Sequence, residues 1–259
     1  MDCRRVIKIK NLSKVFGSFP AVDDLNLEIS RGELFGFLGP NGAGKTTTIR
    51  MLTGLLRPTR GEILINGHSI KTEPIQAKAC LGFVPDEPVL YEKLTGREFL
   101  SFMADLYRVE KGEKEERIPE LLELFGLSDR GDDYIQSYSR GMRRKIAIAG
   151  ALIHDPQVLL LDEPTLGLDP SSARLLKDIL RALVDRGAAV FMSTHILEIA
   201  EHMCTRVGII NQGKLIACGT MAQLRSQAQE TSLEDIFLKL TGGAEYRDTI
   251  RFLGEGVSP

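Results

Sequence analysis

Eight consecutive residues in the N-terminal part of the chain have the types and spacing of a loop that binds phosphate groups. They match the pattern GxxxxGK[ST] and are Gly39, Pro40, Asn41, Gly42, Ala43, Gly44, Lys45 and Thr46. Glycines let backbone N–H groups approach phosphate oxygens closely, a lysine can span the β- and γ-phosphates, and a threonine hydroxyl can ligate Mg²⁺. The pattern predicts a site for a nucleoside triphosphate, without choosing between a kinase, a GTPase and an ATPase.

The segments on either side of this loop support the prediction. Residues 34–38 form an apolar run typical of a buried strand, and residues 46–56 have the spacing of a helix. The loop would therefore end at a helix N-terminus, whose partial positive charge favours anions. Thr47, in the first turn of that helix, belongs to the same predicted nucleotide-binding segment.

Two adjacent carboxylates, Asp162 and Glu163, form a second group that could do chemistry. They follow the apolar run 158–161, which predicts a strand buried beside that of the phosphate-binding loop. Since open α/β sheets bind ligands at the carboxyl ends of their strands, both acids are expected near the phosphates. Asp162 could hold Mg²⁺, through a water molecule, and Glu163 could act as general base toward an attacking water. The alternative is an exposed acidic turn.

Strands and helices alternate along the chain. Strands are expected at residues 6–10, 22–29, 34–38, 158–161 and 188–193, with hairpins at 62–70 and about 211–213. Helical spacing recurs between residues 88 and 156, where the charged stretch 110–117 would be a solvated helix end linking two helices. This order predicts an α/β fold of the P-loop NTPase class with a mostly parallel core sheet, an N-terminal antiparallel β part and an inserted helical subdomain.

The points at which the chain passes from mixed strands and helices to helices alone, and back, predict the domain boundaries. Residues 1–87 and 156–220 would form the ATP-binding core, and residues 88–155 the helical subdomain. Residues 221–259, with helical spacing at 232–240, would be a short C-terminal helical tail.

Composition narrows the classes of partner. The chain of 259 residues has 33 Lys and Arg against 35 Asp and Glu, a net charge of -2 that predicts no nucleic-acid partner. The basic run 143–145 is interpreted as a solvated helix face. Four scattered cysteines indicate reduced thiols in a cytoplasmic protein. Without a signal peptide or an apolar run of about 18–20 residues, the chain is expected to be soluble and to reach a membrane only through a partner.

Further motifs resemble those of the ABC (ATP-binding cassette) ATPases, over roughly residues 4 to 220. Residues 138–142, YSRGM, resemble the LSGGQ signature, Asp169 lies where the family has its D-loop, and His195 matches the switch histidine. Phe16 occupies the A-loop position, where an aromatic ring stacks on adenine. Asp86 aligns with the Q-loop glutamine, and its carboxylate could still reach Mg²⁺, directly or through water.

The resemblance implies a site shared by two chains. Two cassettes would pack head to tail, so that Ser139 and Gly141 of one contact the γ-phosphate bound by the other. His195 would hydrogen-bond the same phosphate. The signature departs from LSGGQ at three positions and keeps Ser139 and Gly141, so an active site is still expected. The second cassette is expected to be an identical chain.

The loop PDEP at 85–88 and the segment 233–242 resemble bacterial ABC-2-type exporter ATPases. This implies an ATPase subunit on the inner face of the cell membrane, with a separate membrane-spanning partner docked at about residues 87–94. A non-transport ABC ATPase acting on DNA or ribosomes is the alternative, and a metabolic kinase is the third. The non-transport interpretation is disfavoured because such ATPases carry long coiled coils or two cassettes in one chain. The kinase interpretation is disfavoured by Glu163 and by the signature.

Overall fold

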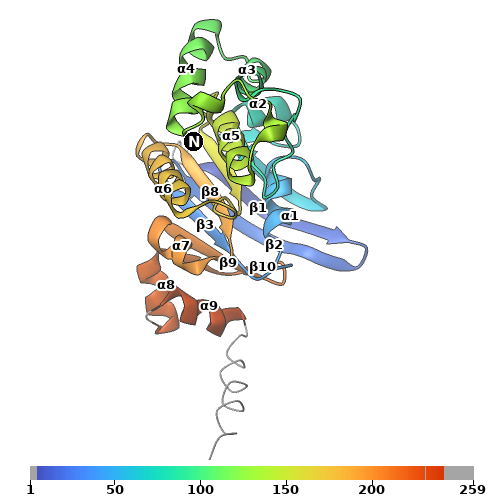
Figure 1. Cartoon of the computed structure of the whole chain (residues 1–259). Helices are drawn as coiled ribbons and strands as arrows, with labels where there is room; N and C mark the ends of the chain where they lie inside the picture. Colours follow the sequence, from blue (N-terminus) through green and yellow to red (C-terminus); the bar gives the residue numbers. More distant parts are fainter. Residues whose placement is uncertain (1–4, 231, 242–259) are drawn as a thin grey trace, which may run out of the picture.

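Two β-sheets form the centre of the molecule, which a computed structural model describes for residues 5–230 and 232–241 (Figure 1). The larger sheet has the order β10-β9-β3-β8-β7-β6, and its strands are β3 (Leu34–Leu38), β6 (Leu81–Val84), β7 (Val158–Asp162), β8 (Ala189–Thr194), β9 (Arg206–Asn211) and β10 (Lys214–Gly219). All neighbours pair in parallel except β9 and β10. Every residue of β3, β7 and β8 is buried, as expected for strands covered on both faces. The predicted α/β class with a mostly parallel sheet is confirmed. The expectation that β7 lies directly beside β3 is wrong, because β8 pairs with both and separates them.

The smaller sheet is antiparallel and has the order β2-β1-β4-β5, with strands β1 (Arg5–Phe16), β2 (Phe19–Ser30), β4 (Arg60–Ile65) and β5 (His68–Ser69). The hairpin about Asn66-Gly67 is confirmed, and both residues have positive φ. The strands β1 and β2 are longer than predicted and pair up to Phe16 and Phe19, which leaves only a two-residue turn between them. This brings both phenylalanines to one tip of the sheet.

The two sheets pack through a shared apolar core. Phe35, Phe37 and Phe191 of the larger sheet lie against buried residues of β1, β2 and β4. The Phe37 and Phe191 ring centroids are 5.2 Å apart. Full burial of one such ring stabilises the fold by roughly 1.5–3 kcal/mol.

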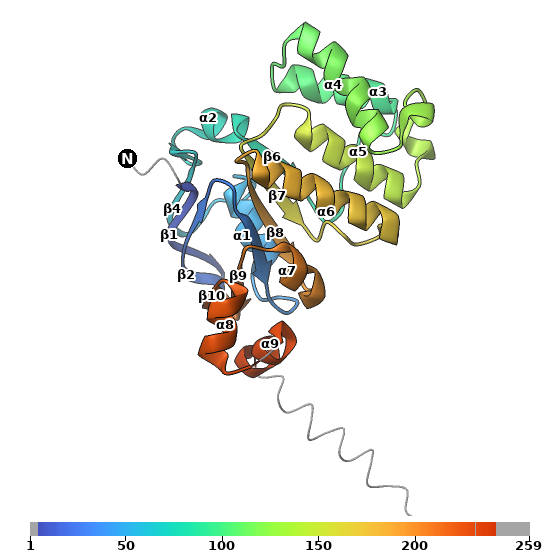
Figure 2. The ribbon, with the colours of Figure 1, turned by 90° about the vertical axis from the view of Figure 1, so that its left-hand side faces the viewer.

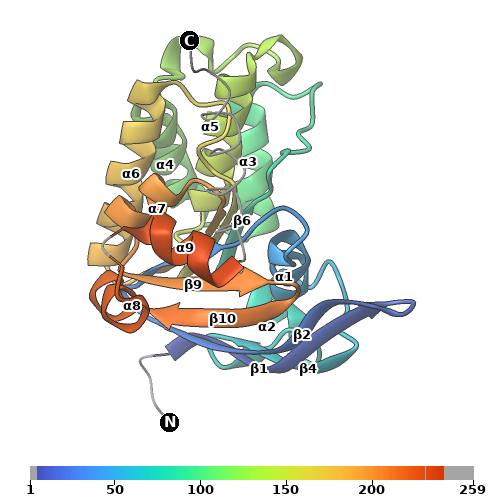
Figure 3. The ribbon, with the colours of Figure 1, turned by 90° about the horizontal axis from the view of Figure 1, so that it is seen from below.

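The helices surround the larger sheet, with α3, α4 and α5 grouped at one end and α8 and α9 at the other (Figure 2). Seen from below, the smaller sheet lies on the far side of the molecule from α3, α4 and α5 (Figure 3). The helices are α1 (Lys45–Leu52), α2 (Pro74–Ala79), α3 (Gly96–Leu106), α4 (Lys111–Leu124), α5 (Arg140–Leu152), α6 (Pro170–Asp185), α7 (Leu197–Met203), α8 (Met221–Ala228) and α9 (Leu233–Thr241). Two 3₁₀ turns, Ser128–Arg130 and Ile135–Ser137, precede α5.

Three details differ from the sequence-based expectation. The helix α1 ends at Leu52, four residues early, because Gly54 has a φ of +70° and ends the turn. The charged stretch 110–117 is a mostly exposed helix end, as expected, but residues 111–117 form the first half of α4, with Glu110 as its N-cap, rather than a link between helices. The elements α2 and β6 were not predicted, since six and four residues are too few for a clear period.

The division into a core, a helical subdomain and a tail stays a prediction, and residues 242–259 of that tail lie outside the described residues. Among residues 5–230 and 232–241, the structure contains no helix long and apolar enough to cross a membrane.

Candidate nucleotide site

The predicted groups leave the carboxyl ends of adjacent parallel strands. The phosphate-binding loop follows β3, His195 follows β8, Glu163 follows β7 and Asp86 lies two residues after β6. Strands aligned in parallel present these ends at one edge of the sheet, which is where such sheets bind ligands. The strand register therefore gathers residues from four distant segments.

The phosphate-binding loop needs glycine at two positions for steric reasons. A Cβ on Gly44 would lie 2.5 Å from the Ala21 carbonyl oxygen, and Gly44 also has a φ of +111°. A Cβ on Gly39 would lie 2.4 Å from the Ile210 carbonyl oxygen. Gly44 is the N-cap of α1 and has no side chain that could cap it, which leaves the first N–H groups of that helix available to a bound anion.

Lys45 is folded back over its own loop. Its Nζ donates hydrogen bonds to the carbonyl oxygens of Gly39, at 2.7 Å, and Pro40, at 3.2 Å. Burial lowers the pKa of Lys45, and the nearby carboxylates of Glu163 and Asp162 oppose that shift. A buried ammonium held only by carbonyl oxygens would be better stabilised by an anion, so the loop is suited to phosphate.

The acid pair is buried and held by the neighbouring strand. The Asp162 carboxylate accepts a hydrogen bond from the Ser193 hydroxyl, and the Glu163 N–H donates to the Ser193 carbonyl oxygen at 3.2 Å. Glu163 has a φ of +48°, unusual for a residue with a side chain. Its Oε1 lies 2.9 Å from Nδ1 of His195, so the candidate base and the candidate switch histidine are in contact.

One pocket, with a volume of about 370 Å³, brings most of the predicted residues together. Its lining comprises Phe16, Phe19, Ala21, Asn41, Gly42, Gly44, Lys45, Thr46, Thr47, Asp86 and Glu163. Pro40 and Ala43 line the adjoining pocket beside the loop. The sequence prediction missed Phe19, which is 62% exposed and pairs with Phe16 across the turn. An aromatic residue directly after a Gly-Ser turn could have indicated it.

The oxygen donors at this site suit Mg²⁺. Thr46, Asp86 and Asp162 offer hydroxyl and carboxylate oxygens, the ligands that this ion prefers, and Mg²⁺ commonly completes its shell with substrate phosphates and water. Across the described residues there is no group of three or more His, Cys, Asp or Glu side chains that would bind a metal ion by itself.

Six predicted site residues do not line the nucleotide pocket or the adjoining one: Gly39, Asp162 and His195, which belong to the surrounding strand ends, and Ser139, Gly141 and Asp169. The Ser139 hydroxyl accepts from the Met142 N–H and caps α5, while the Asp169 carboxylate accepts from the N–H groups of two residues of α6. Hydrogen bonds from Ser171 and Ser172 lower the pKa of Asp169. Among the described residues, a Cβ on Gly141 would meet nothing nearer than a carbonyl oxygen at 3.8 Å. Packing among the described residues of one chain therefore does not explain why position 141 is a glycine.

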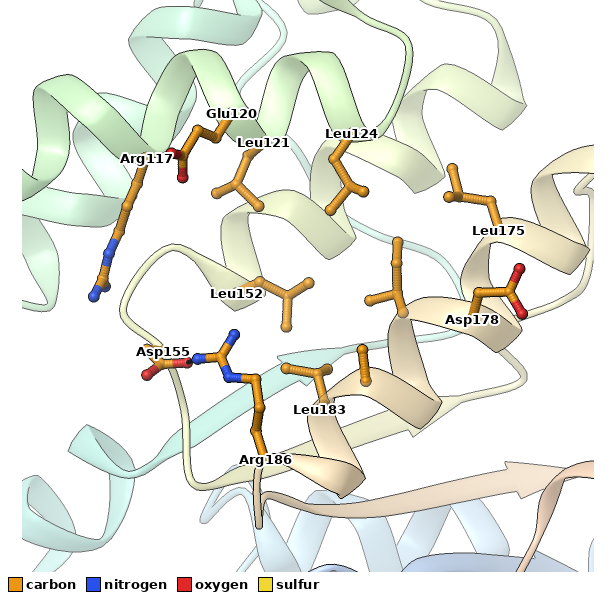
Figure 4. A pocket seen from close by; sticks show the side chains of 12 residues that line it. Arg117, Glu120, Leu121, Leu124, Leu152, Asp155, Leu175, Asp178, Leu183 and Arg186 are labelled. Carbon is orange, nitrogen blue, oxygen red and sulfur yellow. Dashed lines mark hydrogen bonds and ion pairs between the residues drawn. The ribbon is translucent and has the colours of Figure 1, made fainter.

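A larger pocket, of about 460 Å³, lies between α4, the end of α5, and α6 (Figure 4). Leucine side chains from these helices point into it, and an ion pair between Asp155 and Arg186 at 2.8 Å crosses one side. It shares no residue with the nucleotide pocket, and no predicted site residue lines it.

Comparison with known proteins agrees with this arrangement. The ABC transporter family profile matches residues 22–166. An uncharacterized ABC transporter ATP-binding protein of Bacillus subtilis is 46% identical over 82% of this chain and 69% of its own length. A daunorubicin/doxorubicin resistance ATP-binding protein of Streptomyces peucetius is 42% identical over 86% of this chain and 67% of its own.

A solved ATP-binding subunit of an ABC transporter superposes with a TM-score of 0.87. It is 35% identical, and the match covers 91% of this chain and 99% of that one. With this family profile over more than half of its length and relatives at 46% and 42% identity, the chain belongs to the ABC transporter family.

Proposed function

We propose that this chain is the ATP-hydrolysing subunit of an exporter whose membrane-spanning part is a separate chain. One pocket carries the proposal, because it is lined by Phe16, Lys45, Asp86 and Glu163. These residues would supply an aromatic ring to stack on adenine, a cation for the phosphates, a Mg²⁺ ligand and a general base. Several relatives are named for drug resistance or multidrug transport, which supports export over import. Action on DNA or ribosomes finds no support in the net charge of -2.

Each residue has a proposed role. Phe16 stacks on adenine, the loop N–H groups and Lys45 bind the β- and γ-phosphates, and Glu163 accepts the proton of the attacking water. His195 orients the Glu163 carboxylate and hydrogen-bonds the γ-phosphate. Mg²⁺, held by Thr46 with Asp162 and Asp86, would neutralise phosphate charge.

The remaining residues would act on a second copy of the chain. Ser139 is exposed at the N-terminus of α5, and Gly141 lies in the first turn of that helix. They could donate to a γ-phosphate bound by the partner, while Asp169 fixes the start of α6 at the interface. ATP would then favour the closed dimer, and hydrolysis would release it.

A group of exposed apolar side chains marks the proposed docking surface for the membrane partner. Val89 is 95% exposed, and the ring of Tyr91 packs edge-on against Phe102 at 5.1 Å between centroids. Val89 lies three positions after Asp86, so a docked partner would contact the chain next to the nucleotide pocket. Through this contact the chain would be peripheral on the cytoplasmic face of the membrane.

Replacing Val89 with Asp should separate docking from ATP binding. We expect tagged Val89→Asp, purified from detergent-solubilised native membranes, to recover about tenfold less of a co-purifying multi-span protein, since a buried charge opposes an apolar contact. The affinity for a fluorescent ATP analogue should not change. Leu55→Asp, another exposed apolar position, is the control and should behave as wild type. Recovery of wild-type protein with ribosomes, DNA or no partner would contradict the transport proposal.

A further inference from the structure

An arginine outside the predicted site is buried beneath it. The run 143–145 was expected to be a solvated helix face, but this is wrong for Arg144, whose side chain is only 4% exposed. Its guanidinium contacts backbone carbonyl oxygens of two loops, which are those of Pro85, Asp86, Asp162, Glu163 and Pro164.

The five N–H donors of the guanidinium match these five acceptors. Nη1 donates to the oxygens of Pro85 and Asp86, both at 2.6 Å, and Nε donates to that of Pro164 at 3.3 Å. Nη2 donates to the carbonyl oxygens of Asp162, at 3.3 Å, and Glu163. A lysine has three donors at one point and cannot bridge two loops in this way.

The burial of this charge costs free energy that ion pairing does not fully offset. Burial lowers the pKa of Arg144, and the nearest opposing charge is the half-exposed Asp86 carboxylate, 3.9 Å from Nη2. A buried ion of this kind is weak evidence for a role in stability. Its directional contacts are a better reason for its presence.

These contacts fix the backbone of Asp86 and Glu163, whose side chains have the proposed roles in catalysis. Glu163 keeps its left-handed φ of +48° while its carbonyl oxygen accepts from Nη2, and the same guanidinium holds the carbonyl oxygen of Asp86. Arg144 is five residues from Ser139 at the cap of the same helix, α5, which packs along β6 (Figure 2). One rigid helix therefore connects the proposed interface with both loops.

We propose that Arg144 is a positioning residue that locks the Asp86 and Glu163 loops to α5, so that a movement of the signature shifts Glu163 and Asp86 together. This inference rests on the proposed ATPase function. Arg144 contacts neither nucleotide nor water in this scheme, and its effect on hydrolysis comes through the backbone of Glu163.

Arg143, its neighbour on α5, provides a matched control. Arg143 donates to the Glu92 carboxylate at 2.6 Å and to the carbonyl oxygens of Tyr138 and Gln136 at 3.2 Å. All of these partners lie within residues 88–155, and none belongs to the loops of Asp86 or Glu163. An Arg143→Lys substitution thus removes a guanidinium from the same helix without loosening the loops of Asp86 and Glu163.

The test compares Arg144→Lys and Arg143→Lys in the full chain by steady-state ATP hydrolysis, affinity for a fluorescent ATP analogue and melting temperature. We expect Arg144→Lys to lower kcat by about tenfold or more while the Kd for the analogue changes by less than about threefold. Arg143→Lys should keep the wild-type kcat. Equal kcat values for both variants, or a loss of kcat matched by a loss of affinity, would overturn the inference. Failure of the wild type to hydrolyse ATP would instead overturn the proposed function.

A second measurement does not depend on the variant folding. In the wild type without nucleotide, hydrogen exchange should show the exchangeable amides of residues 84–88 and 162–166 opening with the same free energy, because a single side chain holds both segments. Clearly different opening free energies for the two segments would count against a shared clamp.

Discussion

Glu163→Gln should bind ATP, lose at least about a hundredfold in hydrolysis and accumulate as an ATP-bound dimer. Removing a positioned base typically costs 10²–10⁴-fold in rate, and the amide keeps the shape of the carboxylate while it cannot accept the proton. The substitution also removes a negative charge beside the phosphates, which favours the ATP-bound state. Molar mass from light scattering, with ATP and with ADP, and release of inorganic phosphate measure the two effects.

The neighbouring surface supplies the control for this variant. Glu198 is exposed in the first turn of α7, three residues after His195, and Glu198→Gln removes the same charge without touching the pocket. It should hydrolyse ATP and dissociate as the wild type does. Monomeric Glu163→Gln in saturating ATP, or undiminished phosphate release, would remove Glu163 from its proposed role.

Lys45→Ala should lose most of its affinity for ATP. The Lys45 ammonium is buried against two loop carbonyl oxygens, so a bound phosphate would gain strong charge-assisted hydrogen bonds from it. Loss of a buried contact of this kind costs about 2–5 kcal/mol, which corresponds to a rise in Kd of roughly 30-fold or more. Titration with a fluorescent ATP analogue measures the change directly.

The exposed Lys71 offers a comparison with the same change in charge. Lys71→Ala should bind the analogue as tightly as the wild type. Unchanged affinity in Lys45→Ala, or dimers of that variant that form without ATP, would show that the loop does not hold the phosphates as proposed.

The site residues that could be predicted from the sequence are marked by short local patterns. The phosphate-binding loop, the acid pair and His195 each end a strand, so a motif and a short apolar run suffice to place them. Because parallel strands bring their carboxyl ends to one edge, the order of strands then predicts that the groups meet. The structure brings Lys45, Asp86 and Glu163 to one pocket in agreement with this.

The features that the sequence did not reveal depend on tertiary contacts. Arg144 belongs to a basic run on a helix, which usually faces solvent, and only the approach of the loops after β6 and β7 buries it. Phe19 reaches the pocket because the β1–β2 pairing extends to the turn. The burial of Arg144 has no period or motif that can be recognised along the chain, and for Phe19 the only local signal is its place directly after the Gly-Ser turn.

The central claim is that one chain completes the site of another, and cross-linking across that interface tests it most directly. Asn41 is exposed in the phosphate-binding loop and Ser139 is exposed at the start of α5, so cysteines at both positions of a Glu163→Gln chain would face each other in a head-to-tail dimer. Cys3, Cys80 and Cys218 are first replaced by serine; Cys204 can stay, because burial raises the pKa of its thiol to about 12. The account predicts a disulfide-linked dimer with ATP and little without it. No cross-link at saturating ATP, or an equal yield without nucleotide, would contradict the shared site.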